Sequence, residues 1–114
     1  DKSLYYVKND RILLEVNLTT LAEREVYRVS DDWVGYGTWV ANSDCSKLVG
    51  IEIAKSDWTP LNDWQIFHDF FHKGPHCRLL RVDLRSGASQ VIHEEKIRLG
   101  HPIYRPFDDH TVAF

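Results

Sequence analysis

The sequence predicts an all-β fold: a partial β-propeller of about two and a half four-stranded blades, with one inserted helix. The first observation is an internal repeat, because residues 38–50 align with residues 102–114 and residues 13–18 align with residues 79–84. The second observation is that the repeated segments alternate apolar and polar residues, as half-buried β-strands do. Four short antiparallel strands per repeat are typical of a propeller blade.

The repeat divides the chain into blade parts of roughly residues 1–36, 37–100 and 101–114. Residues 1–7 align with residues 45–51, which belong to the second strand of the middle blade. A propeller closes its ring with about four to eight blades. We therefore expect this chain to be a piece of a larger protein, with the remaining blades as its partner.

The third strand of the middle blade is predicted at residues 79–84, before a hairpin turn at residues 85–89 that contains a glycine. Alternate residues of this strand are expected on opposite faces: Leu80, Val82 and Leu84 on one, Leu79, Arg81 and Asp83 on the other.

The inserted helix is predicted at about residues 60–73, because this stretch breaks the repeat and is too long for a tight turn. Thr59 could cap the helix, Pro60 suits the first helical position, and Gly74 would end it. Four side chains fall at helical spacing and form its apolar face: Trp64, Phe67, His68 and Phe71.

Composition and charge exclude several classes of partner. The 114 residues include 43% hydrophobic and 12% aromatic residues, enough for a packed core. The net charge is -3 and the basic residues are scattered, so neither nucleic acid nor an anionic membrane is expected as a partner. Cys45 and Cys77 lie in predicted strands or at strand edges, where a free thiol packs as a small apolar group; a disulfide between them is the alternative.

Three stretches closely resemble oligogalacturonate lyases: DDWVGYGTWVANSDCSKLVGIEI at residues 31–53, CRLLRVDLRSG at residues 77–87 and LGHPIYRPFDDHTVAF at residues 99–114. The resemblance runs along the whole chain, including the inserted helix. It implies a seven-bladed propeller, of which this chain would be an N-terminal to central fragment. It also implies a cytoplasmic enzyme of pectin degradation.

The same resemblance implies the chemistry of the parent protein, which is the β-elimination of short, often unsaturated, galacturonate oligomers with a divalent metal, usually manganese. Neutralising the uronate carboxylate makes the adjacent C–H acidic enough for a neutral histidine to act as the base. The family's metal ligands, catalytic histidine and a key arginine lie C-terminal to the matched region. We therefore expect no catalytic or metal-binding residue in this chain, and no activity from the chain alone. A non-catalytic propeller module that binds or senses carbohydrates is the alternative.

Three residues are candidates for contact with the substrate: His101, Arg105 and Tyr36. His101 begins the inner strand of the last blade part, a position similar to that of the family's later histidines, although it could instead hydrogen-bond between blades. Arg105 and Arg98 could bind a galacturonate carboxylate through two parallel hydrogen bonds, although Arg105 could instead form an ion pair within its turn. Tyr36 could offer its ring to a sugar or pack against the neighbouring blade.

Two further patterns carry expectations of their own. Asp44 and Asp108 are predicted to accept hydrogen bonds within their turns. The segment HDFFH at residues 68–72 places two histidines four apart on a helix, as in zinc hydrolases, with Asp69 in the position of the general base. No third zinc ligand follows at a familiar spacing, although His76 is near.

Overall fold

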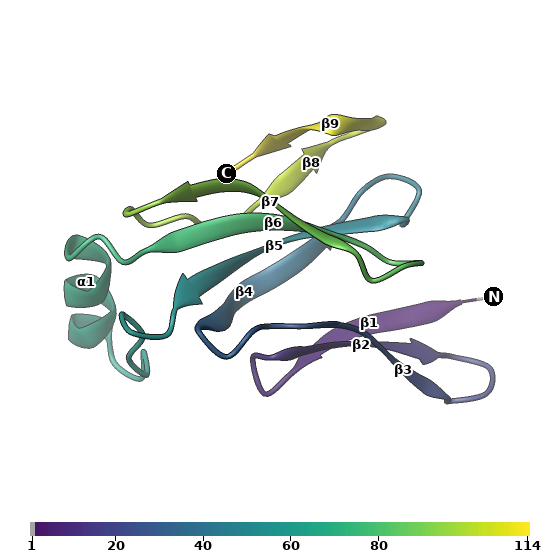
Figure 1. Ribbon diagram of the computed structural model, residues 1–114, viewed down its shortest axis with the longest axis horizontal. Helices are drawn as coiled ribbons and strands as arrows, with labels where there is room; N and C mark the ends of the chain where they lie inside the picture. Colours follow the sequence, from purple (N-terminus) through teal and green to yellow (C-terminus); the bar gives the residue numbers. More distant parts are fainter. Residues whose placement is uncertain (1) are drawn as a thin grey trace.

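The computed structural model describes residues 2–114 and confirms the all-β prediction, because three antiparallel sheets lie side by side and one short helix packs at an end of the middle sheet (Figure 1). The first sheet has the order β1-β2-β3. Its strands are β1 (Ser3–Lys8), β2 (Ile12–Asn17) and β3 (Glu23–Arg28).

The middle sheet has four strands in the order β4-β5-β6-β7, and the third sheet pairs β8 with β9. The bounds are β4 (Trp33–Ala41), β5 (Lys47–Ala54), β6 (Cys77–Asp83), β7 (Ser89–Glu95), β8 (Ile103–Arg105) and β9 (Asp108–Ala113). The repeat makes β1 equivalent to β5, and β8 equivalent to β4. The three sheets are thus arranged as successive propeller blades, of which the middle one has all four strands.

The break between the first two sheets lies between Arg28 and Trp33, whereas the sequence places the boundary after residue 36. Residues 33–36 belong to the middle sheet because they pair in an unbroken ladder with residues 51–54 of β5. The pairing partner, which lies later in the sequence, decides to which blade this segment belongs.

Two apolar cores separate the three sheets. Successive residues of β5 point to opposite faces, so Leu48 enters the core against the first sheet while Val49, Ile51 and Ile53 enter the core against the third. The predicted alternation of β6 is confirmed: Leu80, Val82 and Leu84 share the first core, and Leu79 lies in the second. The inner strands β5 and β6 of the middle sheet are therefore covered on both faces.

The turn predicted at residues 85–89 is confirmed, because it connects β6 to β7 and contains Gly87 at φ 75°. The two cysteines are both free. Cys77 is buried in β6 as expected, but Cys45 is exposed in the turn between β4 and β5, not in a strand. Its φ of 56° explains the difference, because a left-handed residue does not continue a strand.

The helix α1 (Trp64–His72) begins later than the sequence predicts. Asp63, and not Thr59, caps it, because the Asp63 carboxylate accepts a 2.9 Å hydrogen bond from the amide of Ile66. Gly74 follows the helix with φ 67°, as expected for its end. α1 is the one helix among residues 2–114, and its nine residues are too few to cross a membrane.

The predicted apolar face of α1 is only partly correct. Phe70 is the buried residue of the helix, and its ring packs edge-on against Trp58 at a centroid distance of 5.9 Å. Trp64 is 76% exposed and stacks on Phe67, while the His68 side chain is half exposed. Helical spacing alone cannot show which side of the helix meets the sheet, and here the position of Trp58 determines it.

Candidate functional site

Two of the three candidate substrate residues, Tyr36 and His101, line the same hollow, which has a volume of about 190 Å³. They come from different sheets: Tyr36 from β4, and His101 from the segment that enters β8. Both strands are the first of their blades, and β4 and β8 are in contact. Other lining residues are Gly37, Thr38, Arg98 and Pro102.

The backbone is irregular on both sides of this hollow. The β4 ladder shifts register between Tyr36 and Val40, and Gly37 within this bulge has φ 72°. His101 has φ 50°, a conformation that an L-residue adopts at a cost in free energy, and Pro102 follows it. Tyr36 thus lies beside a bulge in β4, and His101 adopts a left-handed conformation before β8. The hollow is lined at these two irregular points and not by regular strand backbone.

Arg98 brings a positive charge to the hollow. Its guanidinium carbon lies 4.8 Å from the ring centroid of Phe71 and 5.6 Å from that of Phe67, both in α1. Tyr36 also contacts Phe71, at a centroid distance of 5.6 Å. Burial raises the pKa of Tyr36 while the nearby Arg98 charge opposes the shift, so the hydroxyl stays protonated at neutral pH. Among the described residues, no carboxylate lines the hollow.

Arg105 does not join this site. Arg105 is exposed at the end of β8, just after the buried Tyr104, where the pairing with β9 shifts register. The expected ion pair within its turn does not form among residues 2–114 either. Asp109 instead faces the middle sheet, 3.4 Å from Lys47 Nζ, and accepts a 2.8 Å hydrogen bond from the Asn42 amide.

The prediction for the two turn aspartates is confirmed. Asp44 Oδ1 accepts a hydrogen bond from the amide of Ser46, and Asp108 Oδ1 accepts one from the amide of His110, each two residues ahead. Side-chain hydrogen bonds from Ser46 and Thr111 lower the pKa of Asp44 and Asp108, respectively, and the backbone bonds add to this effect. Both carboxylates are therefore occupied in their turns.

The histidines of α1 stack on one another, with ring centroids 4.1 Å apart. His68 is thus not packed in the core, and Asp69 accepts a hydrogen bond from Gln65. His76 pairs instead with Glu94, at 2.7 Å. No three potential metal ligands meet among residues 2–114. The described part of the chain therefore does not assemble the zinc site that the HDFFH segment suggests.

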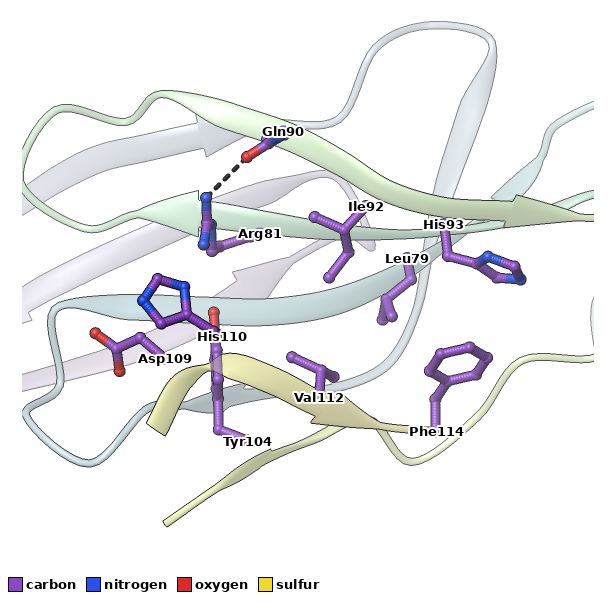
Figure 2. A pocket seen from close by; sticks show the side chains of 10 residues that line it. All are labelled: Leu79, Arg81, Gln90, Ile92, His93, Tyr104, Asp109, His110, Val112 and Phe114. Carbon is purple, nitrogen blue, oxygen red and sulfur yellow. Dashed lines mark hydrogen bonds between the residues drawn. The ribbon is translucent and has the colours of Figure 1, made fainter. Parts of the chain in front are cut away.

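A second hollow, of about 390 Å³, lies between β6 and β7 on one side and β9 on the other (Figure 2). Tyr104, only 4% exposed, directs toward it a hydroxyl that has no hydrogen-bond partner among residues 2–114. Arg81 donates a 2.8 Å hydrogen bond to Gln90 in its wall. Ile92, Val112 and Phe114 contribute apolar surface. None of the three candidate substrate residues lines this hollow. If the last blade continued with a third strand beside β9, that strand would face the middle sheet across this hollow.

Comparison with known proteins gives a match over residues 1–114 to the family model described as oligogalacturonate lyase. The chain belongs to the oligogalacturonate lyase family. It is 63% identical to the oligogalacturonide lyase of Pectobacterium atrosepticum and 61% identical to the oligogalacturonate lyase of Dickeya dadantii, in each case over the whole chain. It spans 29% of the length of each of these curated lyases.

Solved lyase structures agree with the fold. An oligogalacturonate lyase in complex with manganese matches with a TM-score of 0.95 and 62% identity, over 98% of this chain and 30% of that structure. The crystal structure of the Vibrio parahaemolyticus oligogalacturonate lyase matches with a TM-score of 0.91 and 57% identity, over 96% of this chain and 29% of that structure.

Sequence reasoning missed two buried polar residues that hold the sheets together. Glu52 and Asn42 are both buried, and each binds a side chain of a neighbouring sheet. The signal for Glu52 was present, because it follows Leu48 and Gly50 at the period of two that marks one face of β5. Asn42 carries no comparable signal, since turn asparagines usually bond within their own turn.

Proposed function

We propose that this chain is one part of an oligogalacturonate lyase that cleaves short galacturonate oligomers by β-elimination in pectin degradation. The observation that carries the proposal is the juxtaposition of Tyr36, Arg98 and His101 around one hollow at the inner strands of two blades. Hydroxyl, imidazole and guanidinium groups suit an acidic sugar, and the family assignment is consistent with such a ligand. In this proposal Tyr36 and His101 contact the oligomer.

The catalytic base and the metal ligands belong, in the same proposal, to parts of the polypeptide outside this chain. A structural relative is described as a manganese complex, which supports a divalent metal in the complete protein. The described residues do not fit such an ion, because no three His, Cys, Asp or Glu side chains meet among residues 2–114. We therefore propose that the chain alone is inactive, because the catalytic groups lie outside it.

The partners of this chain are the remaining blades of a cytoplasmic, seven-bladed propeller. Two features support this part of the proposal. β1 and β9 are each paired on one side only within the described residues. The hollow beside β9 contains apolar side chains and the unpartnered Tyr104 hydroxyl, which a neighbouring strand would cover.

The test is to follow β-elimination of digalacturonate by the full-length protein and by this chain, each with manganese and then with a chelator. We expect unsaturated product from the full-length protein only, and only with metal. Activity of the chain alone would contradict the placement of the catalytic groups. Binding of digalacturonate by the full-length protein without turnover would instead favour the carbohydrate-binding module.

Two variants of the full-length protein test the hollow. Replacing His101 by Gln or Tyr36 by Phe removes a hydrogen-bonding group, so KM should rise about tenfold, as for the loss of one hydrogen bond worth about 1.4 kcal/mol. Arg105→Gln is the matched control, because Arg105 lies outside the hollow, and it should leave KM unchanged.

A further inference from the structure

We propose that Arg98 binds a carboxylate of the oligomer, and that the inserted helix α1 positions it for this role through Phe67 and Phe71. This inference rests on the proposed function and deepens it. It assigns to the helix, which has no equivalent in the first sheet, a purpose at the substrate site.

Two aromatic rings of α1 flank the exposed side chain of Arg98. Its guanidinium lies within cation–π distance of Phe71 and Phe67. Phe71 also contacts Tyr36, so one ring of α1 supports two side chains that line the hollow. Gly100 also lines the hollow, and a Cβ at this position would lie 3.9 Å from Nε of Arg98.

The charge of Arg98 is uncompensated where it lies. Each of the ion-paired arginines, Arg11, Arg24, Arg28 and Arg78, has a carboxylate partner within 4.0 Å among the described residues, whereas Arg98 has none in that range. The hollow that it lines contains a hydroxyl and an imidazole but no acid. A guanidinium without a carboxylate partner, beside neutral polar groups, is suited to binding an anion.

A uronate carboxylate is the anion that the proposed substrate offers. It has the planar geometry that a guanidinium binds through two parallel hydrogen bonds. Because the phenylalanine rings contact the guanidinium of Arg98, they reduce the conformational entropy that the side chain loses when the carboxylate binds. Arg98 would thus distinguish an acidic sugar from a neutral or esterified one.

Calorimetry on the full-length protein tests this inference without requiring turnover, with digalacturonate and its methyl ester as the two ligands. The unmodified protein should bind the acid more tightly than the ester. Arg98→Gln should weaken binding of the acid at least tenfold, as for the loss of a hydrogen bond to a charged group, and leave binding of the ester nearly unchanged. Arg85→Gln, an exposed arginine outside this hollow, is the matched control and should retain the preference for the acid.

The role of the helix has its own pair of variants. Phe71→Leu keeps the Arg98 charge but removes the ring, so it should weaken binding of the acid and raise KM with little change in kcat. Phe71→Tyr keeps the aromatic ring, so its affinity for the acid and its KM should match those of the unmodified protein. If Phe71→Leu matches the unmodified protein, α1 does not position Arg98.

The outcomes separate this inference from the proposed function. Unsaturated product from the unmodified protein, together with unchanged affinity of Arg98→Gln for the acid, would overturn the role of Arg98 alone. Absence of unsaturated product, together with loss of affinity in Arg98→Gln, would overturn the lyase proposal while supporting an acidic-sugar site at Arg98. An unmodified protein that binds neither ligand would overturn both.

Discussion

The hydroxyl of Tyr27 in β3 donates a 2.7 Å hydrogen bond to Oε2 of Glu52 in β5, so a carboxylate with no exposed surface joins the first sheet to the middle one. Arg78 in β6 donates a 2.7 Å hydrogen bond from Nε to the other oxygen of Glu52, and its Nη2 lies 2.6 Å from the same oxygen in an ion pair. The guanidinium of Arg78 lies in turn 4.0 Å from the ring centroid of Trp33. Burial, followed by the bond to Glu52, raises the pKa of Tyr27, which therefore stays a donor at neutral pH.

Replacing Glu52 by Gln should destabilise the fold by about 3 kcal/mol, because it leaves the mostly buried Arg78 charge without a negatively charged partner. Urea unfolding of the protein would measure the change. Tyr27→Phe removes a single hydrogen bond and should cost less, about 1.5 kcal/mol. Equal effects of the two variants would show that the Arg78 charge is compensated by another group.

Gly50→Ala should destabilise the fold by about 2 kcal/mol through overpacking. A Cβ on Gly50 would lie 2.3 Å from Cδ2 of Trp39, so the indole ring would have to move. Near-ultraviolet circular dichroism would report the displaced tryptophan. Gly100→Ala is the control for stability, since its Cβ would lie 3.9 Å from Nε of Arg98, in ordinary van der Waals contact. An equal loss of stability there would contradict a specific clash at Gly50.

Acid should weaken the fold through its turn aspartates. Hydrogen bonds from the Ser86 amide, the Ser86 hydroxyl and the Arg85 amide lower the pKa of Asp83. A carboxylate with a lowered pKa stabilises the fold above its unfolded-state pKa, and this contribution is lost as the pH falls through the folded-state pKa. The free energy of unfolding should therefore fall as the pH decreases below about 4.

The corresponding control is Asp83→Asn, which removes the titrating group. Its free energy of unfolding should be lower at neutral pH and should fall less steeply in acid, with Asp44 and Asp108 supplying the remaining slope. Urea unfolding at a series of pH values would measure both curves. Parallel curves would mean that Asp83 does not contribute to the acid sensitivity.

The isolated chain should self-associate or be unstable, because β1 has one edge without a strand partner among the described residues and Leu4 on it is exposed. Sedimentation velocity would detect oligomers that increase with concentration. Leu4→Lys places a charge on this edge and should reduce association. A compact, stable monomer of the unmodified chain would contradict the prediction.

Much of the fold could be predicted from the sequence, because strands of a repeat are local patterns. The alternation of Leu79, Leu80 and Val82 determines which face of β6 each side chain occupies, whatever the rest of the chain does. The turn bonds of Asp44 and Asp108 extend over only two residues, and the prediction for both was correct. The residues that carry the family resemblance are likewise contiguous segments.

The candidate site could be predicted only in part. His101 and Tyr36 were identified singly, but their shared hollow depends on a bulge in β4 and on the left-handed conformation of His101. The sequence offered both Arg98 and Arg105 as possible partners of a carboxylate, and of the two only Arg105 was among the candidate substrate residues. Arg98 contacts Phe71 of α1 and lines the hollow, whereas Arg105 is exposed at the end of β8 and lies outside it.

The sequence by itself determined the blades, the alternation of their strands, their turn aspartates and the lyase family, since each depends on residues that are neighbours along the chain. The tertiary structure decided which face of α1 is buried, that Asp109 pairs with Lys47, and that Glu52 bonds to Tyr27. These contacts join residues of different elements or sheets. Their partners are selected by how the packed elements fit together, and no local pattern encodes that choice.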